Sequence, residues 1–100
     1  MINNEQFNIL RKISRETNIS QRKIAKELGY SLGKVNYCLE ALKEKGLIKM
    51  SNFKKNKSKK NYLYFLTPKG FSEKTKITIH FMRKKMQEYD ELQRELDDKN

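Results

Sequence analysis

Apolar positions recur at intervals of three and four residues near the start of the chain. This spacing places them on one face of a helix, and it predicts a first helix from about Asn4 to Thr17. Asn3 and Gln6 have the spacing of a capping box, which satisfies backbone N–H groups at the start of a helix. Asn18 suits the left-handed conformation that often follows a helix. The predicted apolar face comprises Phe7, Ile9, Leu10 and Ile13.

Two further helices follow, with a short link between them. Ser20 is a favourable N-cap for a helix over residues 21–28, and Gly29 can take the positive φ that stops this helix. Ser31 caps a third helix, which runs to about Lys45 before Gly46. The link is so short that the two helices must cross at a steep angle, as in a helix-turn-helix. We expect the third helix to face inward with Leu32, Val35, Leu39 and Leu42.

The pattern then changes to two short runs rich in aromatic and branched residues, Leu47–Phe53 and Tyr62–Leu66. These runs predict the two strands of a hairpin. The loop between them contains no apolar residue and cannot contribute to a core. Its basic residues are Lys54, Lys55, Lys57, Lys59 and Lys60.

A long final helix is predicted from Thr67-Pro68 to about Leu96, because threonine is a good N-cap and proline is favoured at the first helical position. Apolar residues repeat along it at alternating spacings of three and four, as in a heptad seam with one polar member. A domain this small cannot cover a helix of roughly 35–45 Å, so we expect a second copy to cover the seam. The predicted dimer interface is Ile79, Met82, Met86, Tyr89, Gln93 and Leu96.

Charge divides the chain in the same way. The 100 residues carry a net charge of +11, and the whole excess lies in residues 1–70, where 16 bases face 5 acids. Residues 71–100 carry seven of each sign. A basic excess confined to one module favours a polyanionic partner. We therefore expect two parts, a DNA-binding domain over 1–70 and a dimerisation helix over 71–100.

Several classes of protein do not fit this sequence. Cys38 is the only cysteine and is read as a partly buried apolar residue rather than a redox sensor. There is no signal-peptide pattern and no apolar run long enough to span a bilayer, so a cytoplasmic protein without membrane contact is expected. His80 stands without metal-ligand neighbours, and the chain has no nucleophile–base pair or glycine-rich phosphate loop. We expect neither an enzyme nor a bound metal or cofactor.

The outward face of the third helix combines a small residue, a base, an amide and an aromatic hydroxyl: Gly33, Lys34, Asn36 and Tyr37. Such groups can approach a duplex closely and hydrogen-bond base edges or phosphates in the major groove. The first turn of the second helix adds Gln21 and Arg22, where free N–H groups favour a phosphate. The lysine loop would contact the sugar-phosphate backbone or the minor groove. The fold class is thus mainly α with a small β-hairpin, a winged helix-turn-helix domain followed by a long dimerisation helix.

Two alternatives to DNA binding remain open at this point. A winged-helix module could dock on an acidic protein instead. An RNA binder would normally stack aromatic side chains on splayed bases, and only Tyr37 clearly lies on the expected contact face.

The segment ISQRKIAKELGYSLGKVNYCLEALKEKGLIK, the basic wing and the step LTPKG into the last helix resemble winged-helix transcriptional regulators of the MarR family. The short subgroup associated with exopolysaccharide (EPS) gene clusters is the most similar, and PadR-type regulators are a close rival. The resemblance covers roughly residues 5–96. It implies a homodimer that regulates transcription from an inverted-repeat operator in double-stranded DNA, with Ser31 joining Lys34, Asn36 and Tyr37 on the recognition face. Longer members build a dimer domain from helices at both ends and often hold a small-molecule pocket there; the front extension is almost absent here, which makes a small-molecule effector doubtful.

Overall fold

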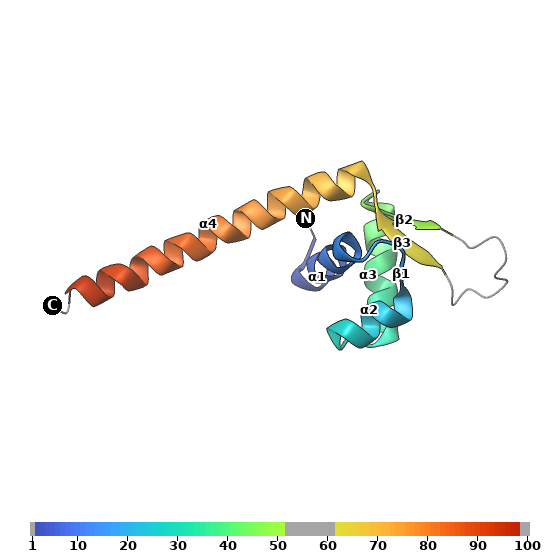
Figure 1. The fold of residues 1–100 in the computed structure, drawn as a ribbon, viewed down its shortest axis with the longest axis horizontal. Helices are drawn as coiled ribbons and strands as arrows, with labels where there is room; N and C mark the ends of the chain where they lie inside the picture. Colours follow the sequence, from blue (N-terminus) through green and yellow to red (C-terminus); the bar gives the residue numbers. More distant parts are fainter. Residues whose placement is uncertain (1, 52–61, 99–100) are drawn as a thin grey trace.

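The computed structural model describes residues 2–51 and 62–98 (Figure 1). Phe53 and the lysines of the predicted wing lie outside the described residues. The elements are α1 (Asn4–Arg15), β1 (Ile19–Ser20), α2 (Gln21–Leu28), α3 (Leu32–Glu44), β2 (Ile48–Ser51), β3 (Leu63–Leu66) and α4 (Pro68–Asp98). The mainly helical fold class with a small sheet and a long last helix is confirmed.

Local sequence signals explain how α1 begins and ends. The predicted capping box is present: the Gln6 N–H donates to Asn3 Oδ1 at 2.8 Å, and the Asn3 N–H donates to Gln6 Oε1 at 3.2 Å. The helix ends at Arg15, two residues before the predicted end. It ends early because Asn18, at φ 67°, turns the chain and donates its N–H to the Tyr64 carbonyl at 3.1 Å. The chain thereby enters the sheet instead of extending the helix.

The caps of α2 and α3 are those predicted. Ser20 and Ser31 each accept the N–H of the residue three positions on, and Gly29 has φ 72°. The inward face of α3 is buried at Val35, Cys38, Leu39 and Leu42.

The prediction that Leu32 faces inward is wrong, because this side chain is 48% exposed. Residues 31–34 are all exposed, so the first turn of α3 projects beyond the core even though position 32 has the right helical phase. Cys38 is buried more completely than expected, at 1% exposure, and takes a place in the core.

The sheet has three antiparallel strands in the order β1-β3-β2. The predicted hairpin pairing is confirmed, with Ile48 opposite Leu66; the last two residues of the predicted first strand lie outside the described residues. The two-residue strand β1 was not predicted; it pairs Ile19 with Tyr64. Ile19, Ile48, Tyr64 and Leu66 join the side chains of α1, α2 and α3 in one core. The sheet therefore covers one side of the three-helix core, and the hairpin extends from this side.

The hydroxyl of Thr67 and the glycine at position 70 determine how the chain passes from β3 into α4. Thr67 Oγ1 donates to the Gly46 carbonyl at 2.6 Å and accepts the Gly70 N–H at 3.0 Å. Gly70 is buried, and a Cβ there would collide with the Leu47 carbonyl. The helix then runs past α1, where the rings of Phe7 and Phe81 lie 5.4 Å apart, and continues alone with residues 82–98 exposed (Figure 1).

Candidate nucleic-acid interface

The outward face of α3 is held in place by the residues on its reverse. Val35 and Leu39 are fully buried, while Gly33, Asn36 and Tyr37 are exposed on the other side. Tyr37 is 72% exposed, so its side chain is available for contact with another molecule. Nothing lies within 4 Å of a Cβ built on Gly33, so this side of the helix is open.

The first turns of α2 and α3 are joined directly. Gln21 Nε2 donates to the Leu32 carbonyl at 3.2 Å, which fixes the angle between the two helices at their N-terminal ends. Ser31 Oγ accepts the Lys34 N–H at 3.1 Å, so this hydroxyl is committed to capping α3. Arg22 is exposed in the same first turn as Gln21. The structure thus brings these predicted site residues to neighbouring helix starts.

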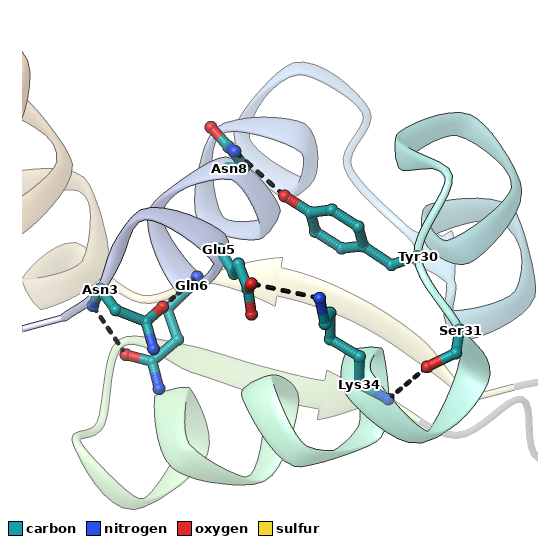
Figure 2. A network of polar contacts seen from close by, with 7 residues as sticks. All are labelled: Asn3, Glu5, Gln6, Asn8, Tyr30, Ser31 and Lys34. Atoms are coloured by element: carbon teal, nitrogen blue, oxygen red, sulfur yellow. Dashed lines mark hydrogen bonds and ion pairs between the residues drawn. The ribbon is translucent and has the colours of Figure 1, made fainter.

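Lys34 is directed toward α1 by a network that the sequence analysis did not identify (Figure 2). Its Nζ lies 3.1 Å from Glu5 Oε1 and 5.3 Å from the centre of the Tyr30 ring. The Tyr30 hydroxyl in turn accepts a hydrogen bond from Asn8 Nδ2 at 3.0 Å. The ammonium of the predicted recognition residue is therefore already paired in the free protein, in a half-exposed position.

Ion pairs connect α2 with α1 and with Glu16, the residue that follows α1. Glu16 lies 2.8 Å from Lys23 Nζ and 3.4 Å from Lys12 Nζ, and Lys12 also reaches Glu27 at 3.2 Å. The hydrogen bond from Lys23 is the main cause that lowers the pKa of Glu16, and the bond to Glu27 chiefly raises the pKa of Lys12. These ion pairs link α2 to α1 at the surface, while Ile24 and Ala25 pack α2 into the core.

The predicted wing lysines lie outside the described residues, but β2 and β3 define the base of the hairpin. Lys49 is exposed on β2 beside buried Ile48. It adds a base that the sequence analysis did not assign to the interface, although the alternation from Ile48 to Lys49 marks it as outward.

The predicted dimer seam is exposed along its whole length. The exposed fractions of its large apolar side chains range from 43% at Ile79 to 67% at Tyr89. Leu92 is 61% exposed beside the seam and was missed, because it does not fit the strict heptad spacing. No helix among the described residues is both long and apolar enough to cross a membrane.

Comparison with known proteins bears on this arrangement. Residues 6–49 match a family model described as "Winged helix-turn-helix DNA-binding". Comparison with curated proteins finds no match.

Solved structures share the fold over most of the chain. The PcaV transcriptional regulator from Streptomyces coelicolor, in complex with its natural ligand, superimposes with a TM-score of 0.75 at 17% identity, covering 82% of this chain and 57% of that one. The MarR family transcription regulator SP03579 gives 0.75 at 22% identity, with coverages of 83% and 54%. FabT of Streptococcus pneumoniae, in complex with DNA, gives 0.70 at 21% identity, with coverages of 87% and 59%.

The chain thus spans little more than half the length of these regulators. The chain therefore has the winged helix-turn-helix fold of the MarR-family transcriptional regulators.

Proposed function

We propose that this chain is a transcriptional regulator of the MarR type, which binds a specific sequence in double-stranded DNA as a homodimer. The observation that carries the proposal is the outward face of α3. Its residues have no role in the core, they combine amide, hydroxyl and glycine groups, and they lie in a domain that carries the whole net positive charge. The FabT structure, whose fold this chain shares, is a complex with DNA, which supports the same partner here.

In this proposal the start of α3 enters the major groove. Asn36 can hydrogen-bond an adenine through both the oxygen and the NH2 group of its side-chain amide, and Tyr37 can contact a thymine methyl or a phosphate. Gly33 allows the helix to approach the base edges closely. Arg22 and Gln21, at the start of α2, contact the flanking phosphates, where the N-terminal end of a helix favours an anion.

The wing lysines, with Lys49 at the base of the hairpin, supply contacts to the sugar-phosphate backbone. Lysine acts as a flexible point charge, so these contacts add affinity rather than sequence discrimination. Two protomers joined through α4 present two copies of α3 to successive major grooves about 34 Å apart, and the operator is then an inverted repeat.

The proposal is tested by selecting bound sequences from a random duplex pool and then titrating the protein with three ligands. These are the selected duplex, a random duplex of equal length and a single-stranded RNA. Binding to the selected duplex should be about 10³-fold or more tighter than to the random duplex at the same salt concentration. Equal affinity for the two duplexes, or preference for RNA, would contradict sequence-specific recognition of DNA.

The homodimer is tested separately by light scattering of the free protein. A mass twice that of the chain is expected at micromolar concentration. A monomer that binds a single half-site would keep the DNA partner and remove the inverted repeat.

A further inference from the structure

The charges of α4 are divided between its two halves. Residues 69–85 contain six bases and one acid: Lys69, Glu73, Lys74, Lys76, Arg83, Lys84 and Lys85. Residues 86–98 contain one base and six acids: Glu88, Asp90, Glu91, Arg94, Glu95, Asp97 and Asp98. The change of sign falls between Lys85 and Glu88, next to Met86 in the exposed seam. The helix is thus a rod with a basic half near the domain and an acidic half at its free end.

A groove runs alongside the basic half. It has a volume of about 690 Å³ and lies between α1 and α4, and Phe7, Phe81, Met82 and Met86 supply apolar side chains to it. Arg11 and Lys85 add positive charge to its lining. Met82 and Met86 belong to both the groove and the seam, so the two form one continuous apolar surface. An amphipathic helix with acidic flanks would complement this surface, and the free half of α4 is such a helix.

We propose that two copies pair through α4 in antiparallel orientation, so that the acidic half of each α4 lies along the groove of the other protomer. The proposal rests on the homodimer proposed above and specifies its geometry. The twofold axis passes close to Met86, where the charge changes sign. The partner's Leu92 then lies opposite Phe81, and the partner's Glu88 lies close to Lys85.

Charge complementarity favours this orientation over a parallel pair. With the axis between Met86 and Gln87, Arg83 lies opposite the partner's Asp90, and Lys76 lies opposite the partner's Asp97. Twofold symmetry repeats each pair, as in any isologous interface. A parallel pair in register would instead place the basic half beside the basic half and the acidic half beside the acidic half.

The position of the domain on α4 gives an independent reason. Phe81, which packs on Phe7, is one residue from Met82 and therefore about 100° around the helix from the seam. The domain accordingly lies on one flank of the rod. In an antiparallel pair, the twofold axis is perpendicular to both helices. Both domains then lie on the same side of the helix pair, where one duplex can reach both. In a parallel pair, the twofold axis runs between the helices and parallel to them. The two domains would then lie on opposite sides of the helix pair.

Spin labels measure the orientation directly in the 100-residue chain. Cys38 is replaced by alanine so that only the introduced cysteine is labelled, and Lys76→Cys carries the label. Lys76 is ten residues from Met86, or about 15 Å along the helix, so antiparallel pairing predicts at least about 30 Å between the two labels. A parallel pair predicts less than about 20 Å, because packed helices are 8–10 Å apart. Gln87→Cys lies beside the crossing point, where the two orientations predict similar distances, and serves as the control.

A charge exchange tests the same pairing without labels. Arg83→Glu and Asp90→Lys should each weaken dimerisation by on the order of tenfold, because each converts two attractive pairs into repulsive ones. The double variant should restore the dimer to within about twofold, since the exchanged charges again face each other across the interface. The two positions are seven residues apart in one helix, too far for direct contact within a protomer.

The outcomes separate this inference from the proposed function. A short distance at position 76, or a double variant no better than the single ones, overturns the antiparallel pairing. An antiparallel dimer that shows no preference for any duplex leaves the pairing intact and removes the proposed DNA recognition. A parallel dimer that binds its operator overturns the antiparallel pairing and leaves the proposed DNA recognition intact.

Discussion

Lys34 is the residue at which the proposed recognition helix meets α1. Its ion pair with Glu5 is half exposed, so it contributes no more than about 1 kcal/mol and can be exchanged for a phosphate or a base edge. The pair nevertheless competes with DNA, because the ammonium must leave the carboxylate or share it.

Replacing Glu5 with glutamine tests this competition. Glu5→Gln should raise the affinity for duplex about two- to fivefold, as expected for the loss of a surface pair of this strength. The slope of log K against log salt should steepen by about one, since one more phosphate contact forms. Glu44→Gln, which makes the same charge change at an exposed position of α3, is the matched control. Equal gains for both variants would assign the effect to net charge alone.

Asn36 and Tyr37 are the residues proposed to distinguish base sequence. Asn36→Ala and Tyr37→Ala should each reduce discrimination between operator and random duplex by about 1–3 kcal/mol. The two affinities are measured by titration at one salt concentration, with Gln87→Ala on α4 as a control that removes an amide elsewhere. If binding to both duplexes fell equally, these side chains would contact the backbone instead.

Cys38 is a structural residue, although it lies on the proposed recognition helix. It is buried in the core, and burial is the main cause that raises the pKa of its thiol, so the reactive thiolate is disfavoured at neutral pH. A disulfide reagent at pH 8 should therefore react slowly with the native protein and rapidly in guanidinium. Rapid reaction without denaturant would show an accessible thiolate and favour a redox role.

At the scale of helices and strands, the boundaries that depend on contacts within a few residues could be predicted from the sequence. The capping box at Asn3, the two serine caps and Gly29 all fix element boundaries through contacts within a few residues, and each is found as predicted. The strand β1 was missed because two residues form no pattern, and its pairing with β3 depends on tertiary contacts.

The candidate site was predictable to the same extent. The outward face of α3 follows from helical phase, which the exposure of Gly33, Asn36 and Tyr37 bears out. The Glu5–Lys34 pair joins residues 29 positions apart, and no linear spacing encodes it. The exposure of Leu32 also depends on where the core ends rather than on periodicity.

Two helical glycines provide a matched pair for the packing of α4. A Cβ at Gly70 would meet the Leu47 carbonyl, whereas a Cβ at Gly33 would meet nothing within 4 Å. Gly70→Ala should therefore destabilise the protein by about 1–3 kcal/mol through overpacking. Gly33→Ala should be neutral or stabilise by up to about 1 kcal/mol, because alanine favours helix. Urea unfolding measures both; equal effects would contradict the close approach of α4 to the sheet.

At the scale of the whole molecule, affinity for DNA should depend strongly on salt. If each protomer neutralises about four phosphates, the dimer neutralises about eight, and the slope of log K against log salt should be near −7. Titrations of operator duplex between 50 and 200 mM salt, a range chosen because about 10³- to 10⁵-fold changes are expected there, give this slope. A slope shallower than about −3 would mean that the wing lysines do not contact the duplex.

The hydroxyl of Thr67 has a consequence far from its own position. It joins the Gly46 carbonyl to the first turn of α4, and so sets the angle at which a helix of 31 residues leaves the domain. Because such a helix is about 46 Å long, a change of about 5° at its root moves its tip by about 4 Å, roughly the rise of one base pair. Substitutions around this hydroxyl would then change the distance between the two DNA half-sites that the proposed dimer binds. Regulators with different operator spacings could arise without any change in the residues that read the bases.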